Sequence, residues 1–391
     1  MTPTVFAKCE NYTVAREAKQ KGIYPYFHEL QSKQDTEVIM EGKRKIMLGS
    51  NNYLGLTVNE EVKNSAIKAI EQYGTGCSGS RFLNGTLNLH LELEKKLADF
   101  LGYESAMTFS TGFQSNLGII SAVVGKDDFV ICDRENHASI YDGCRLCGGT
   151  MLRYKHGDMN SLEKALQKVP KGAGILIVTD GVFSMSGDIA NLPEIVRLKK
   201  KYGAALMVDD AHGLGVIGES GKGTGSHFGL SHEVDLVMGT FSKSLASLGG
   251  YLAASETVCE YVRHNSRPFI FSASMPPACC AAAESALDVL IKQPELPKRL
   301  CELANYMRNA LRAKNIRIKD APTPIIPIYI SDAETTLTVS KRLFDEGVFV
   351  NSVLPPECLL RVSLMASHTK ELIDEAVEII ERVLKEFDII K

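Results

Sequence analysis

Short apolar runs alternate with stretches of helical periodicity through the middle of this chain, and polar residues follow each run. The length of the runs suits strands that are buried on both faces of a sheet. Strands joined by helical crossovers pair in parallel, because the crossover returns the chain to the same edge of the sheet. The alternation therefore predicts an α/β fold with a large, mostly parallel sheet covered by helices. The runs lie at 129–132, 175–178, 205–208, 236–238 and 251–253.

The pattern changes after Pro276 and Pro277, which end the alternation. A long helical pattern then runs over about 278–314, and a final helix is predicted to begin after Thr369, whose hydroxyl can cap it. Between them come strand-like stretches at 325–330 and 359–363 and a helix near 334–346. These elements predict a smaller α+β domain.

A length of 391 residues suits two or three structural units. We expect an N-terminal segment over 1–45, a large cofactor-binding domain over 46–285 and a small C-terminal domain over 286–391. No repeat or Gly/Ser linker separates them, so the two domains are expected to share an interface.

The charge and hydropathy of the sequence argue against a nucleic-acid-binding protein and against a membrane-spanning one. The 44 Lys and Arg residues balance 47 Asp and Glu, which leaves none of the basic excess that nucleic-acid binding requires. Residues 1–21 mix both charges and are not typical of a signal or transit peptide, and no run approaches the roughly 20 apolar residues of a membrane span. We expect a cytoplasmic protein whose ten cysteines stay reduced. The charge pattern shows no sign of peripheral contact with a membrane surface, but it does not exclude such contact either.

Two other sequence patterns invite a functional interpretation that their context does not support. Residues 74–79 and 213–218 fit G-x-G-x-x-G, but neither lies between a strand and a helix as a dinucleotide site requires. Cys144 and Cys147 form a C-x-x-C, with no second pair or nearby His to complete a zinc set. Neither a nicotinamide cofactor nor a metal is predicted.

The residues that follow the predicted strands carry more information. In an open α/β sheet, ligands bind beyond the carboxyl ends of the strands. Each of these side chains alone could be a cap or a satisfied core residue. Together they supply an amine for a Schiff base, a carboxylate for a pyridinium nitrogen, an imidazole to stack on a ring and hydroxyls for a phosphate. The residues are Asp133, His137, Asp180, Ser184, Asp209, His212, Thr240, Ser242 and Lys243.

A second half of a phosphate site precedes the helical stretch 114–124. Gly112 and Phe113 are expected at the N-terminus of that helix, where backbone N–H groups and the helix dipole attract anions. Pyridoxal phosphate fits this set of groups better than a nucleotide does.

The ordered motifs resemble those of the α-oxoamine synthases, a family of fold-type I pyridoxal-phosphate enzymes. The resemblance runs from about Tyr24 to the C-terminus and implies a PLP-dependent transferase fold of type I. The motifs that carry it are Asn51-Asn52-Tyr53-Leu54-Gly55, Asn136-His137-Ala138-Ser139, Gly181-Val182-Phe183-Ser184-Met185, Asp209-Asp210-Ala211-His212, Gly239-Thr240-Phe241-Ser242-Lys243, Phe271-Ser272-Ala273-Ser274 and Leu360-Arg361-Val362-Ser363.

The resemblance also implies a role for each matching residue. Lys243 would hold pyridoxal phosphate as a Schiff base and later act as general acid and base. Asp209 would pair with the pyridine nitrogen, His212 and Ser184 with the ring oxygen, and His137 would stack on the ring. Thr240, Ser242 and the Gly112 and Phe113 amides would hold the phosphate, while Asn51 and Arg361 would bind the substrate carboxylate. The family's active site lies between two subunits, so a homodimer is implied in which Ser272 and Ser274 reach the neighbour's phosphate.

Two strings discriminate within the family. Gly239-Thr-Phe-Ser-Lys-Ser244 and Ser80-Arg-Phe-Leu-Asn-Gly-Thr86 resemble the branch that condenses L-serine with palmitoyl-CoA. That reaction gives 3-ketodihydrosphingosine, CoA and CO2 and is the first step of sphingolipid synthesis. Sister enzymes that use alanine or glycine with a shorter acyl-CoA remain an alternative. A non-catalytic subunit is a second one, although the presence of Lys243 and its partners argues against it.

Overall fold

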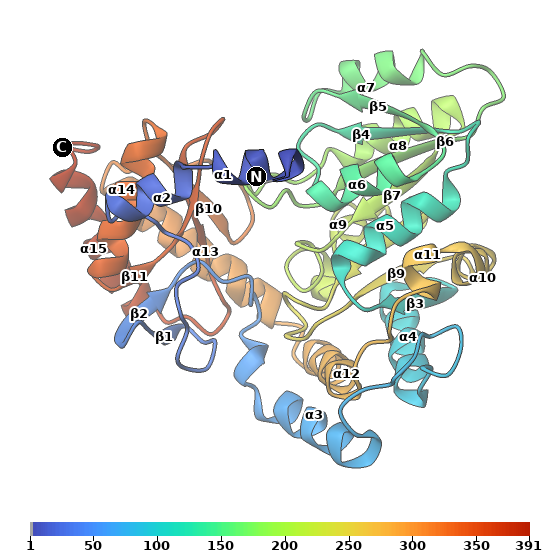
Figure 1. Cartoon of the computed structure of the whole chain (residues 1–391), viewed down its shortest axis with the longest axis horizontal. Helices are drawn as coiled ribbons and strands as arrows, with labels where there is room; N and C mark the ends of the chain where they lie inside the picture. Colours follow the sequence, from blue (N-terminus) through green and yellow to red (C-terminus); the bar gives the residue numbers. More distant parts are fainter. Residues whose placement is uncertain (1–2) are drawn as a thin grey trace.

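The computed structural model describes residues 3–391, and its largest layer is a seven-stranded sheet with strand order β3-β9-β8-β7-β6-β4-β5 (Figure 1). Neighbouring strands from β8 to β5 pair in parallel, whereas β9 is antiparallel to both β8 and β3. The predicted α/β fold with a mostly parallel sheet is confirmed, and each of the five predicted runs lies within a strand. The strands are β3 (Ser105–Phe109), β4 (Phe129–Asp133), β5 (Thr150–Tyr154), β6 (Ile175–Asp180), β7 (Ala205–Asp209), β8 (Leu236–Thr240) and β9 (Gly250–Ala254).

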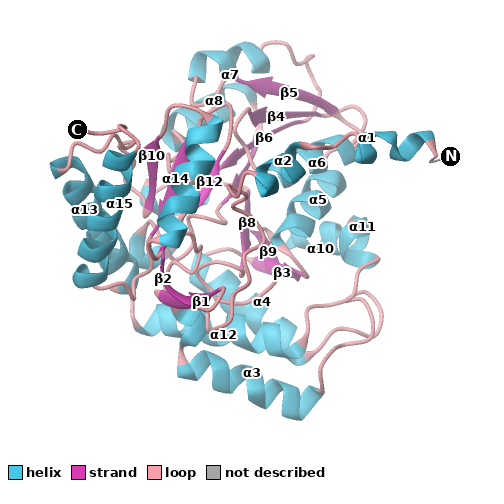
Figure 2. Ribbon diagram, turned by 60° about the vertical axis from the view of Figure 1, so that its left-hand side comes forward, coloured by secondary structure: helices cyan, strands magenta, loops and turns pink. Residues whose placement is uncertain are grey.

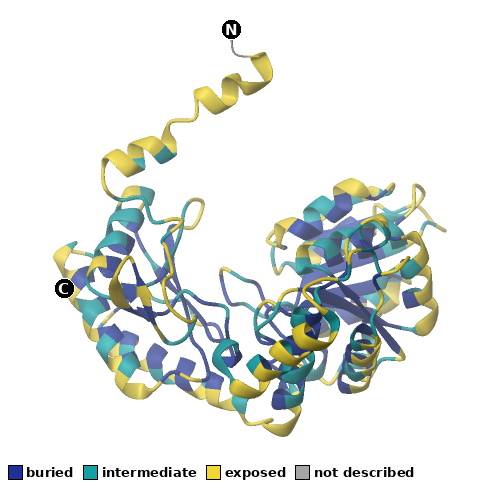
Figure 3. Ribbon diagram, turned by 60° about the horizontal axis from the view of Figure 1, so that its bottom comes forward, coloured by how far each residue is buried: buried dark blue, intermediate teal, exposed yellow. Residues whose placement is uncertain are grey.

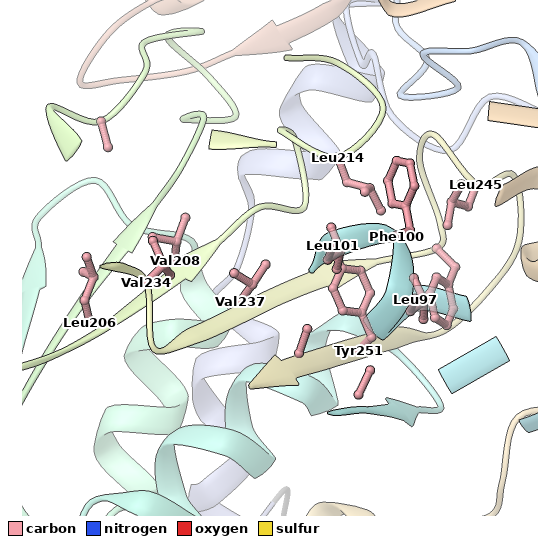
Figure 4. Close-up of a cluster of buried hydrophobic side chains, with 14 of the residues drawn as sticks. Leu97, Phe100, Leu101, Leu206, Val208, Leu214, Val234, Val237, Leu245 and Tyr251 are labelled. Atoms are coloured by element: carbon pink, nitrogen blue, oxygen red, sulfur yellow. The ribbon is translucent and has the colours of Figure 1, made fainter. Parts of the chain in front are cut away.

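Apolar side chains cover both faces of this sheet, because successive residues of a strand point to opposite sides. Leu206 and Val208 of β7 belong to the cluster that includes Leu97 of α4 (Asn88–Leu101; Figure 4), whereas Met207 between them packs with Ile119 of α5 (Gly112–Val123). The helices of this part are α3 (Glu60–Tyr73), α4 (Asn88–Leu101), α5 (Gly112–Val123), α6 (Ala138–Leu146), α7 (Met159–Leu166), α8 (Leu192–Tyr202), α9 (Thr224–His227), α10 (Glu256–Asn265), α11 (Arg267–Ile270) and α12 (Pro277–Lys292). Short 3-10 turns lie at η2 (Leu56–Val58), η3 (Glu219–Gly221) and η4 (Ser231–Glu233).

The C-terminal part contains a small antiparallel sheet of order β10-β13-β12. Its strands β10 (Ile325–Tyr329) and β13 (Leu359–Ser363) correspond to the two predicted strands, and β12 spans Asn351–Val353. The helices are α13 (Leu296–Ala313), α14 (Ala333–Asp345) and α15 (Lys370–Glu386). Thr369 caps α15 as predicted, since its side chain accepts a hydrogen bond from the Leu372 amide.

The predicted long helix over 278–314 is wrong as one element, because α12 ends at Lys292 and α13 begins at Leu296. Pro294 explains the break: the ring of a proline disfavours helical geometry at the residue before it. Gln293 accordingly has φ −125° and ψ 63°. Helix α12 then packs alongside α3, which Figure 2 also shows.

A third sheet joins the two ends of the chain. Its strands are β1 (Glu37–Met40), β2 (Lys43–Met47) and β11 (Val348–Phe349), and β2 pairs in parallel with β11. Strand β2 thus crosses the predicted boundary between residues 45 and 46 while it pairs with a strand of the C-terminal part. The three domain ranges stay a prediction.

The N-terminal elements η1 (Thr4–Phe6), α1 (Ala7–Glu10) and α2 (Val14–Gln20) project away from the body and contain no buried residue (Figure 3). Within residues 3–391, none of the helices has the length and apolar character needed to cross a membrane.

Candidate active site

A cavity of about 230 Å³ lies at the carboxyl ends of β6, β7 and β8, beside the N-termini of α5 and α6. The structure brings most of the predicted cofactor residues together there. Those that line the cavity are Gly112, Phe113, His137, Ser184, Asp209, His212, Thr240, Ser242 and Lys243. They come from five separate segments of the chain, so the fold gathers them as the strand-end argument predicts.

Asp209 ends β7 and is held from two sides. Its Oδ1 accepts a hydrogen bond from the Ala211 amide at 3.0 Å, and its Oδ2 accepts one from Asn116 Nδ2 at 2.7 Å. Asn116 Nδ2 also donates to Ser139 Oγ at 2.8 Å. A buried carboxylate fixed in this way can pair with a protonated ring nitrogen.

Lys243 follows β8 and reaches the same cavity. Burial lowers the pKa of its amine to about 8, against the opposing charges of Asp209 and Asp180. The amine is therefore partly neutral near pH 7 to 8, which is the state in which a lysine acts as a nucleophile.

The two histidines of the cavity are neutral. Burial lowers the pKa of His137 and lowers that of His212 well below its usual range. His137 caps α6 and accepts a hydrogen bond at Nδ1 from the Ser139 amide, while His212 Nδ1 lies 2.7 Å from the Tyr53 hydroxyl. A neutral imidazole fixed by its neighbours is suited to stacking and hydrogen bonding rather than to charge pairing.

The N-terminus of α5 forms one wall of the cavity. A Cβ atom at Gly112 would lie 2.9 Å from Thr240 Oγ1, so this close approach of helix and strand requires glycine. The hydroxyl oxygens of Thr240 and Ser242 lie 2.9 Å apart beside it. Helix amides and hydroxyls together make a phosphate site. With the amine and the carboxylate, this donor set fits pyridoxal phosphate.

Arg361 of β13 brings the small sheet to the site. Its side chain is buried, Nη2 donates to Asn51 Oδ1 at 3.0 Å, and Nε donates to the Ser184 carbonyl. Within residues 3–391 no carboxylate forms an ion pair with this guanidinium, although a buried charge normally needs one. Asn51 lines a neighbouring cavity of about 640 Å³ that Lys243 also lines. The charge of Arg361 therefore lies next to Asn51, although Arg361 itself lines neither of these two cavities.

Ser272 and Ser274 do not line the cavity of their own chain. Ser272 Oγ accepts a hydrogen bond from Gln114 Nε2 at 2.8 Å, and Ser274 Oγ donates to the Gly79 carbonyl at 3.1 Å. Their role toward a neighbouring subunit stays a prediction.

Three residues around the site had no role in the sequence-based prediction, namely Asn116, Ser139 and Tyr53, and Asp180 was predicted only as one of the residues that follow a strand. Asp180 lies directly opposite Asp209 in the sheet and accepts a hydrogen bond from the His137 amide. Burial and the charge of Asp209 raise the pKa of Asp180 well above its usual range. The sequence did contain a signal for Asn116. This residue lies one turn inside the helix α5, on the face of the helix that meets the sheet.

The comparisons with known proteins agree with this geometry. The family described as Aminotransferase class I and II matches residues 43–380, and the chain belongs to that family. It is 53% identical to a serine palmitoyltransferase from Bacteroides thetaiotaomicron, with 98% of each chain covered. It is 45% identical to an 8-amino-7-oxononanoate synthase from Geobacter sulfurreducens, with 96% of this chain and 98% of the other covered.

Solved structures show the same fold. A serine palmitoyltransferase from S. paucimobilis, described with a bound PLP–myriocin aldimine, superposes with a TM-score of 0.96 at 35% identity over the full length of both chains. A serine palmitoyltransferase from Sphingomonas wittichii gives the same three values. The two kinds of relative are both α-oxoamine synthases, so the resemblance drawn from the motifs is confirmed.

Proposed function

We propose that this chain is a PLP-dependent acyltransferase that condenses L-serine with a long-chain acyl-CoA such as palmitoyl-CoA, with loss of CO2. The products are 3-ketodihydrosphingosine and CoA. The choice of substrates rests on one observation, the 53% identity over 98% of both chains to a protein named serine palmitoyltransferase. The Lys243 cavity supports the class of chemistry independently.

The residues that would hold pyridoxal phosphate are those of the Lys243 cavity. The amine of Lys243 would bind the cofactor covalently, Asp209 would hold the ring nitrogen, and His137 would lie against the ring. The bound cofactor supplies an electron sink for negative charge that develops at the substrate Cα. The hydroxyls of Thr240 and Ser242 and the N-terminus of α5 would take the phosphate, while Ser184 and His212 would take the ring oxygen.

Arg361 and Asn51 bind the serine carboxylate in this proposal. The planar guanidinium matches a carboxylate through two parallel hydrogen bonds, which fixes the orientation of the amino acid as well as its position. Once the carboxylate is fixed, the Cα–H bond can be aligned with Lys243 Nζ. Holding the carboxylate until the acyl group has been transferred also keeps it from leaving early.

Lys243 moves the proton. Its amine, with a pKa lowered to about 8, can accept the Cα proton near neutral pH and return it to the product after CO2 has left. Neutral His212 and His137 would leave this proton on Lys243, since burial disfavours their charged forms.

The assembly belongs to the proposal as well. A homodimer would bring Ser272 and Ser274 of one subunit to the phosphate site of the other, which is consistent with their absence from the lining of the cavity of their own chain. A cytoplasmic location stays a prediction from the sequence, which leaves contact with a membrane surface open.

A substrate matrix tests the proposed function. PLP-loaded protein is incubated with L-serine, L-alanine or glycine and with acyl-CoA of two to eighteen carbons, and the ketone products are identified by mass spectrometry. We expect the serine and palmitoyl-CoA pair to give the largest kcat/KM, with no product from Lys243→Ala. Turnover of alanine or glycine with a short acyl-CoA, and none of serine, would show a sister enzyme of the 8-amino-7-oxononanoate synthase type, which the 45% identity favours as the second candidate.

A further inference from the structure

A hairpin between β6 and α8 forms the wall between the Lys243 cavity and a second cavity of about 480 Å³. Residues 182 and 189 pair across the hairpin, and the Phe183 amide donates to the Asp188 carbonyl at 2.9 Å. Alternate side chains of an extended segment face opposite sides. Val182 and Ser184 accordingly line the first cavity, and Phe183 lines the second.

His156, just after β5, contacts both arms of this hairpin from the second cavity. Its ring meets the Phe183 ring edge-on, with centroids 4.4 Å apart. Its Nε2 lies 3.4 Å from Asp188 Oδ2. The side chain therefore lies against the back of the segment whose other face carries Ser184.

The other ring nitrogen of His156 reaches a different loop of the site. Nδ1 lies 3.0 Å from Oδ1 of Asp133, the last residue of β4, and Nε2 lies 3.4 Å from Glu135 Oε2. The chain continues from there to His137, which lines the Lys243 cavity. One imidazole thus touches both the 133–137 loop and the hairpin.

The charges around the ring make this contact strong. Burial disfavours the charged ring, but hydrogen bonds to Asp133 and Asp188 and the charge of Glu135 raise the pKa of His156 to about 10. Burial likewise raises the pKa of Asp188, yet hydrogen bonds from His156 and Lys319 lower it to about 2. The ring is cationic and Asp188 anionic at neutral pH, so both contacts are charge-assisted.

Lys319 extends the network to the small sheet. Its Nζ lies 2.5 Å from Asp188 Oδ2, and its amide donates to the Pro327 carbonyl of β10, the neighbour of β13. The hairpin is thereby held from the large sheet by His156 and from the small sheet by Lys319. Arg361 of β13 bonds to the Ser184 carbonyl at the tip of the same hairpin.

We propose that His156 is a positioning residue that joins the loop ending at His137 to the hairpin that carries Ser184. It lines no part of the Lys243 cavity, and of the residues that the sequence suggested for the site it contacts only Asp133, which lies outside that cavity, so it acts through the two loops. The proposal rests on the proposed function only in that Arg361 is taken to bind the amino-acid carboxylate.

The test uses His156→Gln and Asp188→Asn, alone and combined, in PLP-loaded full-length protein. His232→Gln is the matched control, because that histidine is exposed and lies on η4. Hydrogen exchange followed by mass spectrometry reports the two loops directly and needs no substrate. We expect exchange in 181–191 and 133–138 to become about tenfold faster in each variant, as loss of a hydrogen bond between charged groups predicts, with the rest of the sheet unchanged.

Amino-acid binding gives the second readout. We expect the Kd for L-serine, measured from the cofactor absorbance, to rise about tenfold in each single variant and by less than the product of the two single effects in the double variant, because both variants break the one contact between His156 and Asp188. A lower Tm with uniform exchange and an unchanged serine Kd would show a merely structural role and overturn the proposal, as would additive effects in the double variant. If serine does not bind the unchanged protein, the proposed function fails, while the exchange result still decides the role of His156.

Discussion

Asn116 donates a 2.7 Å hydrogen bond to Asp209, and both side chains are buried at the point where α5 meets the end of β7. The second N–H of the same amide is taken by Ser139 Oγ, so the orientation of Asn116 is fixed. The carboxylate that would hold the cofactor ring is thus positioned by a helix whose first turn would hold the cofactor phosphate.

This contact predicts a specific defect for Asn116→Ala. A hydrogen bond to a charged group is worth about 1.5–3 kcal/mol, so the affinity for pyridoxal phosphate should fall about tenfold or more. An absorbance titration of cofactor-free protein measures it. Asn265→Ala is the control, since that side chain is exposed on α10 and bonds only to the Tyr261 carbonyl among the described residues. Equal losses in both variants would contradict a role through Asp209.

The lowered pKa of Lys243 predicts the pH dependence of cofactor capture. Only the neutral amine attacks the aldehyde, and its fraction grows as pH rises toward the pKa of about 8. The capture rate of cofactor-free protein should therefore rise between pH 6 and 8 and level off above. An unperturbed lysine, with a pKa of about 10.4, would show a rise that continues beyond pH 10. Stopped-flow absorbance gives the profile, with Nα-acetyl-lysine as the reference amine, and a protein profile that matches the reference would contradict the prediction.

Arg361→Lys tests the carboxylate site. Lysine keeps the charge but loses the planar fork and the contacts with Asn51 and the Ser184 carbonyl. We expect the KM for L-serine to rise by about ten- to a hundredfold, corresponding to about 1.4–2.7 kcal/mol, while the KM for palmitoyl-CoA changes little. Initial rates with each substrate varied in turn supply both constants. A change in the KM for palmitoyl-CoA alone would show that Arg361 does not bind the serine carboxylate.

A buried ion pair supports the loop before α4. Arg81 Nη1 lies 2.6 Å from Glu94 Oε1, and the same carboxylate accepts the Thr108 amide of β3. Arg81→Met would leave Glu94 without its counter-charge, which costs about 3–5 kcal/mol in a buried site. Urea denaturation should show that loss in the free energy of unfolding. Arg145→Met removes an exposed pair with Asp142 and should cost less than about 1 kcal/mol, so similar values for the two variants would refute the argument.

The sequence was most informative about the polar side chains that directly follow the predicted strands. Apolar runs located β4, β6, β7, β8 and β9, and most of the polar residues after them line the Lys243 cavity, whereas Asp133 lines the second cavity. The sequence did not predict contacts between segments that lie far apart in the chain. Tyr53 meets His212 and Asn116 meets Asp209 only through tertiary packing. Strand β2 also escaped prediction, because its sequence Lys43-Arg44-Lys45-Ile46-Met47 is mostly charged and its partner β11 lies some 300 residues away.

Gly112→Ala tests the phosphate wall of the cavity. The added methyl group would meet the Thr240 Cβ and Oγ1 atoms at 2.9 Å, and overpacking of this kind costs about 1–3 kcal/mol. Because the helix N-terminus must shift to relieve the contact, binding of pyridoxal phosphate should weaken about tenfold or more. Pyridoxal, which lacks the phosphate, should bind with little change. Gly76→Ala is the control, since a methyl group there meets no atom within 4 Å. Equal weakening for both ligands would mean that α5 does not bind the phosphate.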